Sequence, residues 1–299
     1  MKKLLIIGSN GFIGSSCAVY FRDNYDVFLA DIHPGVNTPI KYRQIKSDVD
    51  FLKILSEKEF DFCINASGSA NVSFSFDFPE VDRKLNVENV KLILDAISET
   101  NNKCKFINFS SASVYGQPDQ LPVSEVQTPA PISPYANHKL ESELILKEYA
   151  EKTGIHTCSL RVFSAYGPVL RKQLFWDIFQ QAKNSKLIRL FGTGKESRDF
   201  IYIDDLLQAV DCVMNNSSFN GESINVSSGK ETSIAEAAEI FLSELGTGYS
   251  VHFNGKSRPG DPLNWRADIT KLTQHGFKQT VDIRQGLSYT AKAYLSLLK

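Results

Sequence analysis

Short apolar runs alternate with longer stretches of helical periodicity through the first 160 residues of the chain. The runs predict strands that are buried on both faces, since a half-exposed strand would alternate apolar and polar side chains. The stretches between them place apolar residues three and four apart, which predicts helices over 81–100 and 135–152. This alternation indicates a parallel sheet built from βαβ units. The predicted strands are Leu4–Ile7, Val27–Ala30, Phe62–Asn65, Phe106–Phe109 and Thr157–Leu160.

The pattern changes beyond Arg161, where turn-forming residues become denser and the segments between them become shorter. Examples are Gly192-Thr193-Gly194 and the stretch from Arg258 to Pro262. No Gly/Ser-rich linker separates the two halves of the sequence, and no internal repeat is present. We therefore expect one part over residues 1–165 and a smaller lobe over 166–299 that closes over the first, with some of the chain crossing between them.

Composition narrows the class of protein. Hydrophobic residues make up 42% of the 299 residues and charged residues 22%, which is typical of a soluble globular protein with a large core. The 33 basic and 34 acidic residues nearly cancel, so the chain has no general electrostatic attraction to nucleic acid or to an anionic membrane. Any anionic ligand must therefore be held by local donors.

Cysteine spacing and the N-terminus bear on location. The five cysteines are scattered, and none has metal-ligand spacing, so we expect reduced core thiols and no metal site. The apolar run after Lys3 ends at Gly8, which is too soon for a signal peptide. No stretch approaches the ~20 apolar residues of a membrane span. These features predict a cytoplasmic protein with no membrane or nucleic-acid partner.

A glycine-rich segment, Gly8-Ser9-Asn10-Gly11-Phe12-Ile13-Gly14, follows the first predicted strand and opens a helix. A dinucleotide pyrophosphate needs backbone N–H groups at a helix N-terminus and no side chains that block its approach. The second predicted strand ends at Asp31, about 20 residues further on, where a carboxylate hydrogen-bonds ribose hydroxyls and repels a 2′-phosphate. This pattern predicts NAD as the cofactor; His33 and Lys41 nearby leave NADP as the less favoured alternative.

Tyr135 and Lys139 stand four residues apart at the start of a predicted helix, with Ser133 at its N-cap and Pro134 in its first turn. That spacing places the phenol and the ammonium on one helix face. An adjacent cation stabilises phenolate, so we expect Lys139 to bring the pKa of Tyr135 down from its usual value of about 10 and to make it a proton acceptor. By itself, however, Tyr-x-x-x-Lys is more often a solvated helix face.

Support for a catalytic interpretation comes from a hydroxyl cluster, Ser110-Ser111-Ala112-Ser113, at the end of the strand predicted at Phe106–Phe109. Sheets of the α/β class place their chemistry where parallel strands end. We therefore predict that these serines and the Tyr135–Lys139 pair form one catalytic site, although a plain polar loop would also account for the serines.

In this order, these residues resemble the extended short-chain dehydrogenases, specifically the nucleotide-sugar epimerase/dehydratase family. The resemblance runs nearly from end to end of the chain. It implies a Rossmann-type doubly wound parallel sheet, of the α/β class, with a smaller C-terminal α/β lobe that binds the nucleotide sugar. The motifs are GSNGFIG (8–14), DV (48–49), NASG (65–68), NV (86–87), SSASVYG (110–116), YANHK (135–139), RVFSAYGP (161–168), SRDFIYIDD (197–205), NVSSG (225–229) and RPGDP (258–262).

The resemblance implies a cofactor site built from several of these motifs. The DV pair would contact the adenine, Ala66, Ser67 and Gly68 would line the middle of the cofactor, and Lys139 would also bind the nicotinamide ribose. The predicted cofactor set is Gly8, Asn10, Gly11, Phe12, Ile13, Gly14, Asp31, Ile32, Asp48, Val49, Ala66, Ser67, Gly68, Asn86, Tyr135, Lys139 and Phe163.

On the substrate side, Ser111 occupies the family position for the hydroxyl that hydrogen-bonds the reacting sugar oxygen. Arg198 and Arg258 match positions that hold the nucleotide diphosphate, which suits the planar fork of arginine, and Asp261 lies on the nucleotide-ribose side. We interpret His138 as a helix-surface residue and not as a second catalyst. The predicted catalytic set is Ser111, Tyr135 and Lys139, and the predicted substrate set is Ser111, Ser113, Ser164, Arg198, Tyr202, Arg258 and Asp261.

Departures from the family pattern narrow the reaction. Ser164 stands where many members have Asn, which leaves the substrate contacts there open. Ala112 and Ser113 stand where the 4,6-dehydratases carry an Asp-Glu pair, and the glutamate of the related decarboxylases is also missing at Ser113. Dehydration needs such carboxylates as acid and base, so it is not expected here.

Reversible hydride transfer at a sugar carbinol remains. We predict an NAD-dependent nucleotide-sugar epimerase that acts at C4 through a transient keto-sugar, with Tyr135 as acid and base. The alternative is an NAD(P)H-dependent reductase of an NDP-4-keto-6-deoxysugar; a non-catalytic dinucleotide-binding regulator is less favoured. The predicted partner is a nucleotide-diphosphate sugar whose base and sugar stay open. The resemblance also implies a homodimer through the helices over 81–100 and 135–152, which periodicity alone does not distinguish from internal packing.

Overall fold

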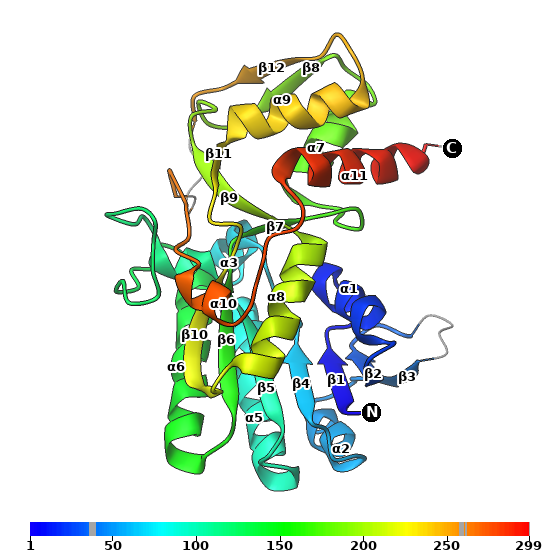
Figure 1. Cartoon of the computed structure of the whole chain (residues 1–299), viewed down its shortest axis with the longest axis vertical. Helices are drawn as coiled ribbons and strands as arrows, with labels where there is room; N and C mark the ends of the chain where they lie inside the picture. The colour runs from blue at the N-terminus through cyan, green and yellow to red at the C-terminus, as the bar shows by residue number, and fades with distance from the viewer. Residues whose placement is uncertain (36–39, 257–259, 261, 299) are drawn as a thin grey trace.

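Seven parallel strands form the central sheet of the chain (Figure 1). The computed structural model describes residues 1–35, 40–256, 260 and 262–298. The strand order is β10-β6-β5-β4-β1-β2-β3, and every neighbouring pair is parallel. All five predicted strands are confirmed, whereas the sequence pattern predicts neither β3 nor β10. The strands are β1 Lys3–Ile7, β2 Asp26–Asp31, β3 Lys41–Gln44, β4 Phe62–Asn65, β5 Lys105–Ser111, β6 Thr157–Val162 and β10 Asn220–Val226.

The helix predicted over 81–100 is confirmed as helical but is divided into three segments. Helix α4 leads into a π-helix, Lys84–Glu88, and the chain continues as α5. Short π-helical segments are frequently found at functional sites. The helix predicted from residue 135 is α6, and the Ser133 hydroxyl caps it by accepting a hydrogen bond from Ala136 N at 3.2 Å. The helices around the central sheet are α1 Phe12–Phe21, α2 Asp50–Ser56, α3 Val72–Asp77, α4 Pro79–Arg83, α5 Asn89–Thr100, α6 Pro134–Thr153 and α8 Ile203–Asn216.

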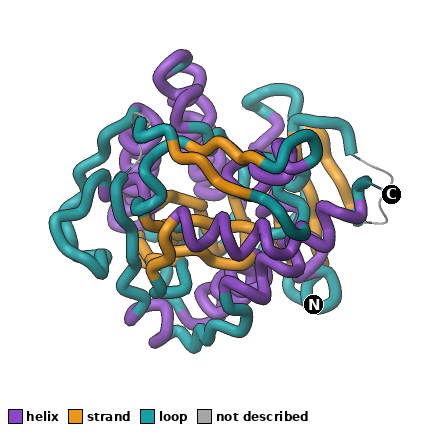
Figure 2. Tube along the Cα trace, turned by 90° about the horizontal axis from the view of Figure 1, so that it is seen from above, coloured by secondary structure: helices purple, strands orange, loops and turns teal. Residues whose placement is uncertain are grey.

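Helices cover both faces of the central sheet, and Figure 2 shows them (purple) around the strands (orange). Along β1, Leu4 and Ile6 belong to one hydrophobic core, while Leu5 and Ile7 belong to a second core on the opposite face. Helices α1 and α8 supply side chains to the first core, and α2, α5 and α6 supply side chains to the second. Burial on both faces explains the unbroken apolar runs and confirms the doubly wound α/β class.

The smaller lobe, at the top of Figure 1, has an aromatic core. The ring centroid of Phe175 lies 5.4 Å from those of Tyr166 and Phe200 and 5.3 Å from that of Phe241. The chain crosses back from this lobe, because β10 pairs with β6 and α8 packs against α1. The remaining elements are β7 Ser164–Tyr166, α7 Gln173–Ala182, β8 Leu187–Leu190, β9 Ser197–Tyr202, β11 Glu231–Ser233, α9 Ile234–Leu245, β12 Ser250–Phe253, α10 Thr270–Gln274 and α11 Ile283–Ser296.

The cysteines lie where the apolar contexts of the sequence place them. Four of them are buried, Cys212 is partly buried, and all five are free thiols. Nowhere in the described ranges is a helix both long enough and apolar enough to cross a bilayer.

Two glycines with positive φ separate the effect of backbone conformation from that of crowding. Gly8 has φ +80°, and a Cβ there would lie 2.4 Å from Ser67 N. Gly154 has φ +73°, and a Cβ there would have no described atom within 4 Å apart from its immediate surroundings in the chain. We expect Gly154→Ala to lower the free energy of unfolding by about 1 kcal/mol, from the left-handed conformation alone.

For Gly8→Ala we expect a loss of ~3 kcal/mol or more, because the backbone of the loop after β4 must also shift. Denaturant unfolding of both variants measures the two losses. Equal losses would contradict the close contact between the two loops.

Candidate active site

Four loops or strand ends lie at the carboxyl edge of the central sheet. Gly8 follows β1, Ala66–Gly68 follow β4, Ser111 ends β5 and Phe163 follows β6. The first two loops touch, since a Cβ on Gly8 would lie 2.6 Å from the carbonyl carbon of Ala66. Because parallel strands end at the same edge, the glycine loop and the serine cluster share this edge of the sheet.

The glycine loop leaves backbone donors available at the start of α1. Gly11 is the N-cap residue, and among the described residues no side chain caps this helix. A Cβ on Gly14 would lie 2.1 Å from the carbonyl oxygen of Gly8, so a side chain there would push the helix off the strand. Asn10 and Gly11 are exposed, whereas Phe12 and Ile13 pack against the core. Uncapped N–H groups at an exposed helix N-terminus suit a pyrophosphate.

Asp31 closes the glycine turn from the neighbouring strand. Its Oδ2 accepts a hydrogen bond from Asn10 N at 2.9 Å, and its Oδ1 accepts one from His33 N at 3.1 Å. The buried carboxylate thus ties the turn after β1 to the end of β2. Asp48 and Val49, predicted to contact the adenine, and Ile32, also predicted to bind the cofactor, are all at the surface.

Asn86 fits a polar ligand group. It is 1% exposed on the π-helix, and neither atom of its amide has a hydrogen-bond partner within the part of the chain that the structure describes. Its Oδ1 faces the loop after β4, because a Cβ on Gly68 would lie 2.5 Å from it. A buried amide without a partner is costly. Together with the uncapped start of α1 and the Asp31 carboxylate, this amide makes the residues present fit NAD.

The three residues predicted to be catalytic come together. The side chain of Tyr135 hydrogen-bonds that of Ser111. The Nζ of Lys139 lies 5.8 Å from the centroid of the Tyr135 ring and donates to the carbonyl oxygen of Phe109 at 2.9 Å. Tyr135 N donates to Ser75 Oγ at 3.0 Å, which attaches the start of α6 to α3. The sheet edge and the start of α6 therefore bring a partly exposed serine hydroxyl together with a buried phenol and a buried ammonium.

Burial dominates the electrostatics of this group. Desolvation raises the pKa of Tyr135 to about 12; the hydrogen bond from Ser111 opposes this shift and the charge of Asp82 adds to it. Desolvation lowers the pKa of Lys139 to about 8, against the charges of Asp82 and Glu143. The expectation that Lys139 lowers the pKa of Tyr135 is therefore wrong for the chain by itself. Its ammonium is directed at the Phe109 carbonyl, and the loss of hydration outweighs it.

The other two serines of the cluster differ from each other. Ser110 Oγ donates to Glu143 Oε1 at 2.5 Å, and Glu143 is paired with Arg161 at 2.7 Å, so Ser110 belongs to a buried structural network. Ser113 is buried, and its Oγ has no hydrogen-bond partner in the described ranges. Within this cluster, Ser113 is therefore the serine whose hydroxyl has no described hydrogen-bond partner, since Ser111 Oγ accepts from Ser113 N at 3.1 Å.

The residues predicted to bind substrate are distributed over the second lobe. Ser164, half-buried, begins β7 and pairs in register with Phe200 of β9. The guanidinium of Arg198 lies 5.5 Å from the centroid of the Trp265 ring. Tyr202 is buried with its ring 5.6 Å from that of Tyr166, in the aromatic core of this lobe. Two further predicted residues lie outside the described ranges: Arg258 and Asp261.

His138 is not a helix-surface residue, contrary to the interpretation of the sequence. Its Nδ1 lies 2.7 Å from Oδ2 of Asp82, and its side chain is 12% exposed. Sequence reasoning also missed Asp82 and Ser75, which both contact the first turns of α6. The signal available in the sequence was weak: Asp82 stands one helical turn before Asn86.

The class that combines such a sheet with such a catalytic group is the extended short-chain dehydrogenases/reductases. Within that class, the chain belongs to the NAD dependent epimerase/dehydratase family, whose model matches residues 4–227. The resemblance inferred from the motifs is confirmed.

Individual relatives are similar along their whole length. A Methanocaldococcus jannaschii protein provisionally named a UDP-glucose 4-epimerase is 30% identical over 95% of both chains. The UDP-N-acetylglucosamine 4-epimerase of Methanobrevibacter ruminantium, solved with UDP-N-acetylmuramic acid, has 29% identity and a TM-score of 0.89 over 99% of each chain. The UDP-glucuronic acid 4-epimerase of Bacillus cereus, solved with UDP-glucuronic acid and NAD, has 28% identity and a TM-score of 0.89 over 99% of each chain.

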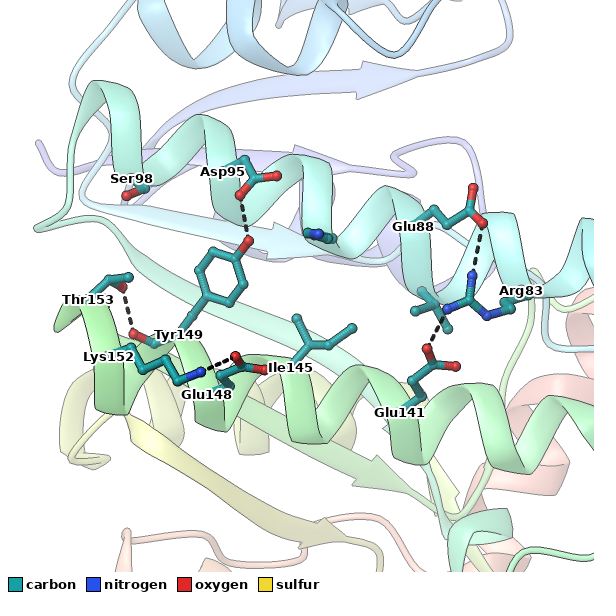
Figure 3. Close-up of a pocket in the computed structure, with 12 residues that line it drawn as sticks. Arg83, Glu88, Asp95, Ser98, Glu141, Ile145, Glu148, Tyr149, Lys152 and Thr153 are labelled. Atoms are coloured by element: carbon teal, nitrogen blue, oxygen red, sulfur yellow. Dashed lines mark hydrogen bonds and ion pairs between the residues drawn. The ribbon is translucent and has the colours of Figure 1, made fainter.

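A separate groove of about 640 Å³ lies between α5 and α6. Figure 3 shows Arg83 reaching across it toward Glu141, and Tyr149 reaching toward Asp95. Among its described lining residues, none belongs to the predicted site. The lining residues are Arg83, Val87, Glu88, Lys91, Asp95, Ser98, Glu141, Ile145, Glu148, Tyr149, Lys152 and Thr153.

Asn86 offers a test of the cofactor site that does not depend on turnover. Asn86→Leu removes a buried amide that has no partner in the chain, so we expect the stability without cofactor to be unchanged or higher. The affinity for NAD should fall by roughly tenfold, as expected for one lost hydrogen bond. Calorimetric titration with NAD and thermal unfolding of the NAD-free variant measure the two effects.

Asn65→Leu is the matched control. The amide of Asn65 is buried and donates to Asn108 Oδ1 at 2.9 Å, so its removal should lower stability. If Asn86→Leu behaved like Asn65→Leu and left NAD affinity unchanged, the assignment of Asn86 to the cofactor site would be wrong.

Proposed function

We propose that this chain is an NAD-dependent 4-epimerase of UDP-linked sugars. The observation that carries the proposal is the Ser111–Tyr135–Lys139 group at the carboxyl edge of the sheet, with its phenol and ammonium buried, together with the amide of Asn86, which has no described hydrogen-bond partner. The full-length similarity to UDP-sugar 4-epimerases supports both the substrate class and the position of the reacting carbon.

Proton handling is the task of the chain's own residues. Ser111 would hold the C4 oxygen of the sugar while Tyr135 takes the proton from that oxygen, and the same two groups would return it on the other face. Lys139, buried as an ammonium, would stabilise the phenolate and hold the nicotinamide ribose. NAD, when bound, supplies the hydride acceptor and a positive charge that favours phenolate.

Two features favour epimerisation over the related reactions. Buried Ala112 and Ser113 carry no carboxylate where a dehydratase needs acid and base, so loss of water from the keto-sugar is not supported. The Asp31 carboxylate beside the glycine turn favours NAD over NADP, and a tightly held NAD suits a cycle that consumes no net reductant. An enzyme that instead reduces an NDP-4-keto-6-deoxysugar would release its oxidised cofactor after each turnover.

Substrate is held from the second lobe in this proposal. Arg198 is placed over the face of Trp265, and Trp265 packs on Phe163 at 5.9 Å between ring centroids, next to the strand end that carries Ser164. Arginine binds phosphate oxygens with two charge-assisted hydrogen bonds. We propose that Arg198 and Arg258 bind the diphosphate and that Asp261 binds the nucleotide ribose.

Tyr135→Phe tests the catalytic assignment. It removes the proton acceptor and keeps the ring, so we expect interconversion of UDP-glucose and UDP-galactose, or of their N-acetyl or uronic acid counterparts, to fall by about 10²–10⁴-fold. Chromatographic separation of the C4 epimers measures the rate. Tyr249→Phe, in the second lobe, is the matched control and should keep the full rate.

The same purified protein separates the two enzyme hypotheses. Retained NAD in the absorbance and mass spectra, with epimer formation and no added reductant, supports the epimerase. NADPH consumption with a 4-keto-6-deoxysugar nucleotide and no epimerase activity would replace it with the reductase.

We also propose that the chain forms a two-fold dimer through the groove between α5 and α6. A two-fold interface places the same surface against itself. The groove carries Arg83 and Lys91 as well as Asp95 and Glu148, so a second copy meets charges of both signs and not a field of one sign. The apolar Ile145 lies among these charges and supplies contact area.

Ile145→Lys should convert this dimer to a monomer at micromolar concentration, because the two substituted ammonium groups would be brought near each other and partly buried. Light scattering on a size-exclusion column measures the mass against the 33.4 kDa of one chain. Leu187→Lys, on β8, is the control and should leave the mass unchanged. A monomeric parent protein would refute the dimer.

A further inference from the structure

Asp82 is a buried carboxylate that the proposed reaction does not use directly. It lies on α4 and is 0% exposed. Its Oδ2 is 2.7 Å from His138 Nδ1, and its Oδ1 has no hydrogen-bond partner among the described residues. A carboxylate only accepts hydrogen bonds, so the Nδ1 of His138 carries the hydrogen. A buried ion or ion pair does not by itself stabilise a fold, so the pair alone does not account for a carboxylate at this place.

The Asp82–His138 pair joins two segments that carry parts of the proposed active site. Asp82 stands one helical turn before Asn86, and His138 stands on α6 between Tyr135 and Lys139. The side chain of His138 is 12% exposed, so the contact is largely closed to water. The pair therefore fixes the start of α6 against the segment that bears the unpartnered cofactor-side amide.

Charge balance then distinguishes Asp82 from Glu143, the other carboxylate that acts on Lys139. Glu143 is paired with Arg161, whose Nη2 and Nε lie 2.7 Å and 3.1 Å from its oxygens. The partner of Asp82 is an imidazole, which is not a permanent cation. Lys139 donates to the carbonyl of Phe109, so its ammonium is not neutralised by direct contact with a carboxylate. Asp82 and Glu143 both raise the pKa of Lys139, and of these two carboxylates Asp82 is the one that is not paired with an arginine.

Other charged groups near these helices are directed elsewhere. On α6 the titratable neighbours of Lys139 are Tyr135, His138 and Glu143, and β6 contributes Arg161 behind Glu143. At the outer surface, the π-helix and the residues beside it form ion pairs that face the solvent: Lys84–Asp48, Arg83–Glu88 and Arg83–Glu141. Helix α3 ends at Asp77, whose carboxylate is exposed.

We propose that Asp82 is a positioning residue of the active site. Held by His138, its carboxylate fixes the catalytic helix and supplies the negative charge that keeps Lys139 protonated while Tyr135 exchanges its proton. This inference rests on the proposed roles of Tyr135 and Lys139.

The charge of Asp82 shifts the pKa of Lys139 and of Tyr135 in the same direction, which fixes the sign of the change expected when that charge is removed. The charge of Asp82 raises the pKa of Lys139 against desolvation, and it also raises the pKa of Tyr135. Removing that charge therefore lowers both pKa values. A reaction that needs Tyr135 deprotonated and Lys139 protonated has a pH profile whose two limbs depend on these two pKa values. Both limbs should move to lower pH together, which a purely structural defect would not do.

Asp82→Asn tests the proposal in the whole chain, because it keeps the shape of the side chain and removes the charge. In protein labelled with ¹³C-lysine, the side-chain resonance of Lys139, assigned with Lys139→Arg, reports its titration without substrate or cofactor. We expect the midpoint to fall by about one pH unit from the parent value near 8. The pH profile of kcat should shift in the same direction, with little change in KM.

Glu141→Gln is the matched control, since it breaks the Arg83–Glu141 ion pair that joins the same two helices at the surface. It should leave the Lys139 midpoint and both limbs of the profile in place. His138→Asn, which keeps a neutral donor for Asp82, should also keep the Lys139 midpoint. If Asp82→Asn does not fold, the double variant Asp82→Asn/His138→Asn carries the same test, because the two amides can hydrogen-bond each other.

An unchanged Lys139 midpoint in the Asp82 variant, or an equal shift in Glu141→Gln, would overturn the proposal. The resonance titration needs no turnover, so its outcome is independent of whether the chain is an epimerase. A shifted midpoint in a protein without epimerase activity would keep the role of Asp82 and reject the proposed reaction.

Discussion

Burial of ionisable groups at the carboxyl edge of the sheet is the constraint on which the site depends. Tyr135 and Lys139 are enclosed by the start of α6 and the end of β5. Burial favours the neutral form of each side chain, so it raises the pKa of Tyr135 and lowers the pKa of Lys139. Asp82 and Glu143 oppose this shift at Lys139, whereas Asp82 adds to it at Tyr135, and Arg161 is paired with Glu143. The result is a nearly neutral enclosed set of charges, in which small changes of charge act strongly because water does not screen them.

The same edge brings together the residues of the proposed cofactor site and those of the proposed catalytic group. Three features have polar groups without a described hydrogen-bond partner from a side chain and could bind polar ligand groups: the uncapped start of α1, the amide of Asn86 and the hydroxyl of Ser113. Each belongs to a helical segment: the start of α1, the π-helix Lys84–Glu88 and the 3-10 turn Ala112–Tyr115. Preorganised groups of this kind need little rearrangement when a ligand binds, which is what positioning a sugar carbon against a nicotinamide requires. The second lobe, with its own aromatic core, carries the residues proposed to bind the nucleotide sugar.

Much of this was accessible from particular residues of the sequence. The apolar runs from Leu4 and from Phe62 could only be strands covered on both faces, and the Ser133-Pro134 start located α6 to within a residue. Other features had no local signal. The strand β3, Lys41–Gln44, is mostly exposed at the edge of the sheet and lacks an apolar run, and β10 comes from the second half of the chain. The sequence predicts His138 to be a surface residue, because its partner Asp82 is 56 residues away in the chain and no local pattern links the two.

The sequence by itself determined the fold class, the family, the glycine loop and the identity of the Ser/Tyr/Lys group, because these depend on local periodicity and on residues close together in the chain. The tertiary structure alone decided the electrostatics. The pKa of Tyr135 moves up and not down, because the balance of desolvation, hydrogen bonding and charge involves groups 24 and 53 positions away, Ser111 and Asp82. Contacts between distant segments are made by packing, and a linear pattern of residue types does not encode them.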